Sequence, residues 1–194
     1  HIHKEIFNNR EQLRLKRELF FCQEYMQINL EFARAFDFGC GSGNLTNHLL
    51  AMGLNVVAAD VSTKFLNLVE SKYKSSKLKT LLLNDGSLSK IEDNSFDLVA
   101  TYSVLHHIPD YLFACKELVR ICKPGGIIFI DHERNNDFWE KQTEYKIFLR
   151  NACKFDFKKY LRPSNYYNKI LSLFNPRHTN EGDIHVWPDD HIEW

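Results

Sequence analysis

The chain has 194 residues, which is enough for one domain with a substantial hydrophobic core. Its 25 Lys and Arg residues balance its 25 Asp and Glu residues, and this zero formal charge argues against a dedicated nucleic-acid binder, which usually has a basic surplus. No apolar run approaches membrane-spanning length and no secretory signal pattern is visible, so we expect no membrane span.

The cysteines are odd in number, scattered, and without C-x-x-C spacing. This pattern is typical of reduced thiols, rather than of a disulfide framework or a zinc site. The sequence therefore predicts a cytoplasmic protein. The five cysteines are Cys22, Cys40, Cys115, Cys122 and Cys153.

Residues 1–30 are interpreted as a separate N-terminal helical segment. From residue 3 onward it is rich in Lys, Glu, Arg, Gln and Leu and contains neither Gly nor Pro. Apolar side chains recur there at roughly helical spacing, which predicts one or two helices packing on the rest of the molecule. These apolar positions are Ile6, Leu13, Leu19, Phe20 and Ile28.

Residues 36–50 read as the end of a buried strand, a glycine-rich turn and the start of a helix. Gly39, Gly41 and Gly43 alternate, so the backbone can take positive φ and a ligand can approach it closely. A helix starting near Gly43 and Asn44 would point its unpaired N–H groups and positive dipole end at the turn. A strand, a glycine turn and a helix form the nucleotide site of doubly wound folds.

The spacing of these glycines separates the turn from two other nucleotide sites. The dinucleotide fingerprint is G-x-G-x-x-G, and here the third glycine comes one place early. No Lys-Ser/Thr pair follows, which excludes a phosphate-binding P-loop. Asp37 adds a carboxylate from which a pyrophosphate binder would gain nothing. These details favour a nucleoside ligand that carries positive charge.

Strand and helix patterns alternate along residues 31–133. We expect strands at 32–38, 55–59, 79–83, 96–102 and 127–130, a helix at 63–73, and another from near Pro109 to Cys122 that the K-P-G-G run stops. The alternation predicts an α/β fold, a doubly wound and mostly parallel sheet of order 3-2-1-4-5 with helices on both faces. The ligand should lie at the carboxyl ends of the strands, beside the first strand.

Three stretches resemble the class I S-adenosylmethionine (SAM)-dependent methyltransferases. D-F-G-C-G-S-G at 37–43 resembles their motif I, and S-F-D-L-V-A-T-Y-S-V-L-H-H-I-P-D at 95–110 resembles their fourth-strand motif. L-V-R-I-C-K-P-G-G-I-I-F-I at 118–130 resembles the helix, turn and fifth strand that follow. The resemblance implies a Rossmann-like domain with SAM as cofactor, and it allows the N-terminal segment to be a lid over the ligand.

The resemblance also implies roles for single residues. Asp60, at the end of the second strand, would bind the ribose hydroxyls, unless it only caps the helix that starts near Ser62. Asp85, after the third strand, would accept a hydrogen bond from the adenine amino group, unless it only forms an Asx turn. Asp37 would orient the methionine end. The expected cofactor-binding residues are Asp37, Gly39, Cys40, Gly41, Asp60, Val61, Asp85, Gly86, Ser87, Thr101 and Tyr102.

Histidines supply the candidates for a proton-accepting residue, because imidazole titrates near neutral pH. His106 and His132 are the expected catalytic residues, with His107 a weaker candidate. The alternative for His106 and His107 is a hydrogen-bonded structural role. His132 and Glu133 directly follow the fifth strand, so either one could touch the acceptor.

Residues 134–194 are expected to be a helical or loop cap on the acceptor side. The family's sheet normally closes with two further strands, and no convincing run for them is present, so we expect the C-terminal edge strands to be missing. The tail has residue types that bind metals but no known ligand spacing, and no metal is predicted. These tail residues are His178, His185, Asp189, Asp190 and His191.

The resemblance implies methyl transfer from SAM to a small-molecule acceptor, with oxygen the expected acceptor atom. A non-catalytic SAM-binding regulatory protein is one alternative. An RNA or protein methyltransferase is another. T-Y-S-V at 101–104, in place of the N-P-P-[Y/F] of many nucleic-acid enzymes, argues against it, while the basic aromatic stretch 146–162 keeps it open. The oligomeric state is not predicted.

Overall fold

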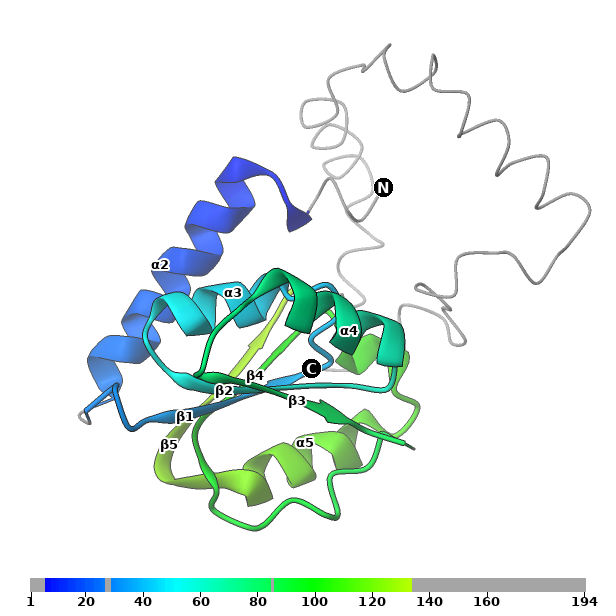
Figure 1. Ribbon diagram of the computed structural model, residues 1–194. Coiled ribbons are helices and arrows are strands. Elements are labelled where there is room, and N and C mark those ends of the chain that lie inside the picture. Colours follow the sequence, from blue (N-terminus) through cyan, green and yellow to red (C-terminus); the bar gives the residue numbers. More distant parts are fainter. Residues whose placement is uncertain (1–5, 27–28, 85, 134–194) are drawn as a thin grey trace, which may run out of the picture.

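The computed structural model describes residues 6–26, 29–84 and 86–133. These residues form an α/β unit in which strands and helices alternate (Figure 1). Its elements are α2 (Asn9–Tyr25), β1 (Arg34–Phe38), α3 (Asn44–Ala51), β2 (Asn55–Asp60), α4 (Thr63–Lys72), β3 (Leu78–Leu82), β4 (Phe96–Tyr102), the 3-10 turn η1 (Leu105–His107), α5 (Tyr111–Ile121) and β5 (Cys122–Asp131).

The five described strands form one sheet of order β3-β2-β1-β4-β5, and every neighbouring pair is parallel. The predicted fold class and strand order are therefore confirmed. Helices α2, α3 and α4 cover one face of this sheet and α5 covers the other (Figure 1). Phe38 ends the central strand β1, in register with Ala59 of β2 and Thr101 of β4. The order of the strands reverses beside β1, with β2 and β3 on one side and β4 and β5 on the other, and ligands bind at such a point in doubly wound folds.

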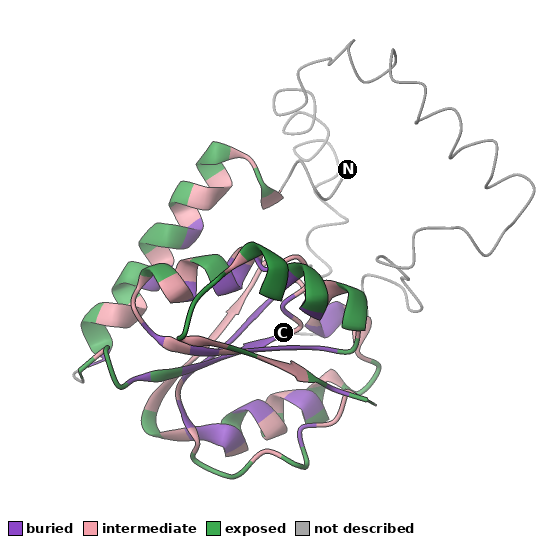
Figure 2. Cartoon of the chain, in the orientation of Figure 1, coloured by how far each residue is buried: buried purple, intermediate pink, exposed green. Residues whose placement is uncertain are grey.

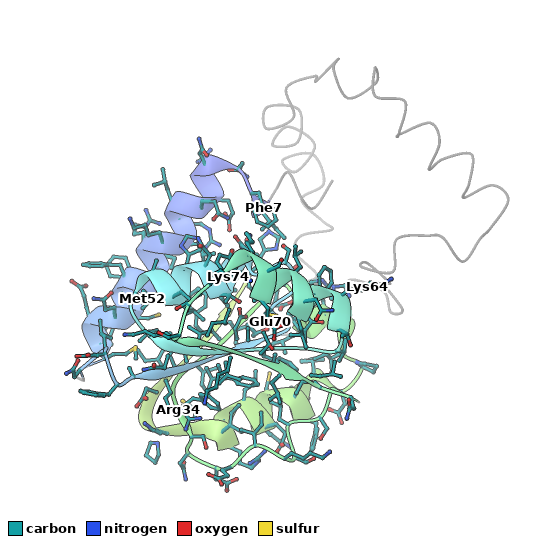
Figure 3. The ribbon with its side chains drawn as sticks, in the orientation of Figure 1. Phe7, Arg34, Met52, Lys64, Glu70 and Lys74 are labelled. Atoms are coloured by element: carbon teal, nitrogen blue, oxygen red, sulfur yellow. The ribbon has the colours of Figure 1, made fainter. Side chains whose placement is uncertain are left out.

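Buried side chains alternate between the two faces of β1, as the period of two in a strand requires. Ala35 belongs to the core under α2 and α3, whereas Phe36 belongs to the core over α5. Figure 2 shows the buried residues concentrated along the strands and the inner faces of the helices. The Phe36 and Phe96 rings lie 5.0 Å apart, and the Arg34 guanidinium, labelled in Figure 3, covers the Phe96 ring at 4.8 Å. Both central faces of the sheet are thus closed to water.

Three of the described α-helices begin with a side-chain cap, and α3 does not. Asn8, Ser62 and Asp110 accept backbone N–H groups at the starts of α2, α4 and α5. At the start of α3 the capping position is Gly43, with φ +83° and no side-chain bond. The N–H groups of the first turn of α3 therefore have no capping side chain.

The buried face of α2 differs from the predicted one. Leu15 and Leu19 are buried, whereas Leu13 is 68% exposed and Phe20 is 53% exposed. Residues four apart share one face of a helix, so Leu15 and Leu19 point together at the sheet. The prediction combined residues from different faces, and Ile28 lies outside the described residues.

The K-P-G-G run also differs from its prediction as a turn, because it lies inside β5. Helix α5 ends at Ile121 and β5 begins at once with Cys122. The pairing of β4 with β5 shifts register between Phe96 and Leu98, and Gly125 has φ +78°. These are features of a β-bulge, where glycine is tolerated well.

Within the described ranges, no helix is both long and apolar enough to cross a membrane. Residues 134–194 lie outside those ranges. The expected cap and the expected absence of C-terminal edge strands therefore remain predictions.

The packing of α2 can be tested with two leucines of the same helix. Leu19→Ala should lower the free energy of unfolding by about 2–5 kcal/mol, because Leu19 is fully buried. Leu13→Ala should change it by less than about 0.5 kcal/mol, because Leu13 is exposed. Urea unfolding measures both. Equal losses in the two variants would contradict the observed orientation of α2.

Candidate functional site

The glycine turn at residues 39–43 is attached to the end of β2. The N–H groups of Gly39 and Cys40 both donate to the carbonyl oxygen of Ala59, at 2.9 Å each. The N–H of Gly43 closes the turn onto the carbonyl of Cys40 at 2.9 Å. Gly39 and Gly41 have φ of +74° and +49°, which glycine adopts at little cost. The turn is thus fixed where the carboxyl ends of β1 and β2 meet.

Asp60 links this turn to the following helix. Its Oδ2 accepts the N–H of Gly41 and its Oδ1 accepts the N–H of Ser62, each at 2.8 Å. The cap of α4 is Ser62, whose side chain accepts the N–H of Phe65, so Asp60 bonds the capping residue and is not itself the cap. A carboxylate offers about four acceptor sites, so these two bonds leave capacity for two ribose hydroxyls. The neighbouring Val61 side chain is exposed.

Asp37 is a buried acid beside the turn. Its side chain is only 1% exposed, and its Oδ2 accepts the hydroxyl of Thr46 on α3 at 2.5 Å. Burial raises the pKa of Asp37 to about 7, with a further contribution from the negative charge of Asp60, while the Thr46 hydroxyl opposes the rise. A positive charge nearby would favour the ionised form. This environment fits the cationic ligand that the sequence predicts.

Cys40 lies in the same turn, and its surroundings disfavour the thiolate form of its side chain. Burial raises the pKa of the thiol, and the charges of Asp37 and Asp60 raise it further. The reactive form of cysteine is the thiolate, which this environment disfavours. Cys40 contributes through its backbone N–H.

Thr101 and Tyr102 end β4 and point to opposite faces of the sheet. Tyr102 lies in the core under α2 and donates its hydroxyl to Oε1 of Glu11 at 2.8 Å. Thr101 is fully buried, and its hydroxyl has no hydrogen-bond partner among the described residues. The two residues therefore cannot contact a ligand from the same side.

The two histidine candidates have different surroundings. His132 follows β5 with φ +59°, is partly exposed, and stacks on the Tyr102 ring at 4.9 Å. His106 is buried in η1, and its Nδ1 lies 2.6 Å from Oε2 of Glu133. The structure thus leaves His132 partly exposed directly after β5 and buries His106 against Glu133.

Helix α2 supplies polar contacts that sequence reasoning missed. The Arg14 guanidinium bonds Glu11 at 2.6 Å and Asp131, at the end of β5, at 2.7 Å. Gln12 donates to Oδ1 of Asn44 at 2.9 Å, at the first position of α3. Only the i, i+3 spacing of Glu11 and Arg14 was visible in the sequence, and it is common on solvated helices.

The expected adenine site is described in part. Gly86 has φ +74°, and the Ser87 and Ser89 hydroxyl oxygens lie 2.9 Å apart. Asp85 itself lies outside the described residues. Its contact with adenine therefore stays a prediction.

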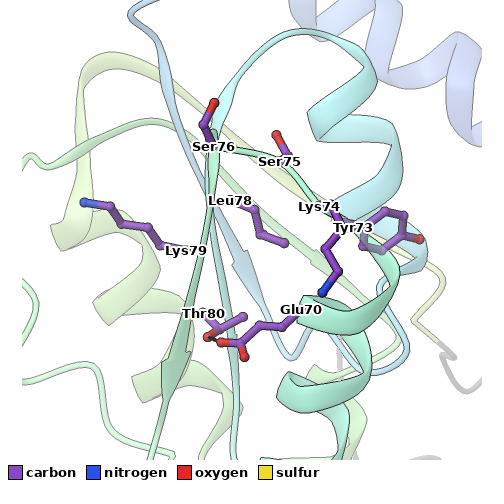
Figure 4. A pocket seen from close by; sticks show the side chains of 8 residues that line it. All are labelled: Glu70, Tyr73, Lys74, Ser75, Ser76, Leu78, Lys79 and Thr80. Carbon is purple, nitrogen blue, oxygen red and sulfur yellow. Dashed lines mark hydrogen bonds between the residues drawn. The ribbon is translucent and has the colours of Figure 1, made fainter.

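A separate hollow of about 450 Å³ lies beside the edge strand β3 (Figure 4). It lies next to the end of α4 and the start of β3, and a hydrogen bond joins the Thr80 hydroxyl to Glu70 across it. None of its lining residues is an expected site residue. They are Glu70, Tyr73, Lys74, Ser75, Ser76, Leu78, Lys79 and Thr80.

The turn can be tested with two glycines that share a positive φ. A side chain at either position costs about 1–2 kcal/mol of backbone strain. A Cβ on Gly39 would also come within 2.5 Å of Cγ2 of Val104, whereas a Cβ on Gly41 would meet no atom of the described part of the chain within 4 Å. Gly39→Ala should therefore be less stable than Gly41→Ala by about 1–3 kcal/mol in urea unfolding. Equal stability would contradict the close packing of Val104.

The buried acid predicts a specific pH dependence. With the pKa of Asp37 at about 7 when folded and at its ordinary 3.8 when unfolded, the folded chain binds more protons between these values. This stability is present below pH 3.8 and is lost as the pH rises through 7, by up to about 4 kcal/mol. Asp37→Asn should remove that loss and be more stable than the wild type at pH 8. Urea unfolding from pH 5 to 8 measures it, and parallel curves for the two proteins would contradict it.

Comparison with known proteins gives a family for this fold. Residues 36–130 match a family model described as a methyltransferase domain. The demethylmenaquinone methyltransferase of Staphylococcus aureus (strain MRSA252) is 38% identical over 98 residues, which are 49% of this chain and 41% of that protein. The match thus covers less than half of the relative's length.

Solved structures share the fold. The PH0226 protein from Pyrococcus horikoshii OT3 has a TM-score of 0.58 and 24% identity, covering 72% of this chain and 66% of that one. The trans-methyltransferase CalH, in complex with SAH, has a TM-score of 0.50 and 18% identity, covering 57% and 34%. At these identities the likeness shows the fold alone. The family match, the motifs and the parallel sheet together show that residues 36–130 are a methyltransferase domain of the class I, SAM-dependent family.

Proposed function

We propose that this chain is a SAM-dependent methyltransferase acting on a small-molecule acceptor. The observation that carries this proposal is the bonding of the glycine turn to Asp60 beside the end of β1. A backbone held in this way offers a fixed surface to a nucleoside at the carboxyl edge of the sheet.

The described residues fit such a cofactor. Among the described residues the space around Gly41 is open, because a Cβ there would meet none of their atoms within 4 Å. Asp60 would hold the ribose, and Asp37 would orient the methionine end through its buried carboxylate. Both acids favour a ligand with positive charge. The cofactor, when bound, supplies a methyl group on a sulfonium, and the chain contributes mainly by positioning it.

The proposal for the acceptor has less support than the proposal for the cofactor. The curated relatives are named for demethylmenaquinone, which supports a small molecule as acceptor here. Oxygen as the acceptor atom rests on the family resemblance alone. We also propose a cytosolic location, which the four described cysteines support because all are free thiols.

His132 is the better candidate to accept a proton from the acceptor. It is partly exposed at the carboxyl edge of the sheet and held against Tyr102. His106 is buried and hydrogen-bonded to Glu133. A general base must come within hydrogen-bond reach of the proton it removes, which favours His132.

Binding of S-adenosylhomocysteine (SAH) to the full chain, measured by calorimetry, tests the cofactor proposal. The wild type should bind, and Asp60→Ala should weaken binding by about 1–3 kcal/mol, because charge-assisted hydrogen bonds are lost. Asp97→Ala is the matched control. Asp97 also accepts a backbone N–H, that of Arg34 at 2.9 Å, and lies near the start of β4, at the other end of the sheet. This control should bind SAH like the wild type.

A 2′-deoxyribose analogue of SAH separates the ribose contact from a change in the turn. The wild type should bind this analogue more weakly than SAH, whereas Asp60→Ala should bind the two equally. Equal binding of both ligands by the wild type would rule out the ribose role. Binding without turnover on any acceptor would instead favour the non-catalytic alternative.

A further inference from the structure

Glu133 is a buried carboxylate that binds the turn after β4. Its side chain is only 3% exposed, and it lies two residues beyond the end of β5. Its Oε1 accepts the N–H groups of Val104 at 2.8 Å and Leu105 at 2.9 Å. Its Oε2 accepts the N–H of His106 at 3.3 Å and contacts the His106 ring at 2.6 Å. One carboxylate thus gathers three successive backbone donors.

Two residues in the left-handed region bring these groups together. His132 has φ +59° and Ser103 has φ +61°, a conformation that residues other than glycine rarely adopt. The N–H of Ser103 donates to the carbonyl of Asp131 at 3.0 Å, which joins the chain just after β4 to the end of β5. Asp131 contacts Arg14 of α2. Asp131 and Glu133 are only two residues apart, but Asp131 contacts α2 whereas Glu133 binds the turn after β4.

The turn that Glu133 holds packs against the glycine turn. A Cβ on Gly39 would come within 2.5 Å of Cγ2 and 2.8 Å of Cγ1 of Val104. The Val104 side chain therefore already occupies the space beside Gly39. Its backbone N–H is at the same time bonded to Glu133. A continuous set of contacts runs from Glu133 through Val104 to the first glycine of the turn.

We propose that Glu133 is a positioning residue for the cofactor. It fixes the Val104–His106 turn against Gly39 and so shapes the cofactor site at the end of β4. This inference rests on the proposed function. It assigns the carboxylate no contact with the reacting atoms. A competing explanation is that Glu133 only stabilises the fold, as a cap on η1.

The first experiment compares SAH affinity of the full chain and Glu133→Gln by calorimetry, with thermal unfolding in parallel. Glu133→Gln keeps the shape of the side chain but removes its charge, and we expect SAH affinity to fall at least tenfold. Asp97→Asn is the matched control, because Asp97 also accepts a backbone N–H, but near the start of β4. The SAH affinity of Asp97→Asn should stay within about twofold of the wild type, even if this variant loses as much stability as Glu133→Gln.

A second variant separates positioning from capping. Val104→Ala keeps the N–H that Glu133 accepts but removes the side chain beside Gly39. Val104→Ala should weaken SAH binding several-fold. The double variant should lose less binding free energy than the sum of the losses in the two single variants, because both act through one contact. Binding of SAH should also shift the NMR signals of the His106 ring in the wild type, and not in Glu133→Gln.

The outcomes distinguish this inference from the proposed function. If Glu133→Gln binds SAH like the wild type and only loses stability, Glu133 is a cap and the inference is wrong. If Glu133→Gln does not fold, unchanged affinity in Val104→Ala is enough to overturn it. If the wild type itself does not bind SAH, the proposed function fails and this inference fails with it.

Discussion

The site depends on one buried carboxylate at the end of β2. Asp60 accepts the N–H of Gly41 before α3 and the N–H of Ser62 before α4, so one side chain fixes the approach to two helices. Both N–H groups are on partly buried residues. Removing the carboxylate would take away the hydrogen-bond partner of each, at the place where the chain must hold its shape. Because Asp60 is the last residue of β2, its hydrogen bond to Gly41 holds the glycine turn against the sheet.

A second constraint comes from charge. Asp37 and Asp60 lie close enough for the charge of Asp60 to raise the pKa of Asp37, and both residues are more than nine-tenths buried. Two acids in one buried site are stable together only if one takes a proton or a cation lies near them. The unliganded chain can use the proton. This arrangement explains how a net-neutral protein can still favour a cationic ligand at one point.

Much of this architecture is local in the sequence and could be predicted from it. Apolar runs, alternating glycines and acids at strand ends predicted the strand order, the start of α3 near Asn44 and the place of Asp60. Contacts between distant residues gave no such signal. Arg14 meets Asp131 from 117 residues away, and Glu133 meets the backbone of Val104 from 29 residues away. Charged residues of this kind also occur on any solvated surface, so their partners cannot be known before the chain is folded.

The position of β3 at an outer edge of the described sheet has a consequence for self-association. The backbone groups of this strand that face away from β2 could pair with a strand of another molecule. The strand has only five residues, and the exposed Lys79 lies within it. Short edges and lysine both oppose such pairing, because a second strand would have to bury the charge. The short length of β3 and the charge of Lys79 thus disfavour edge-to-edge pairing at this strand.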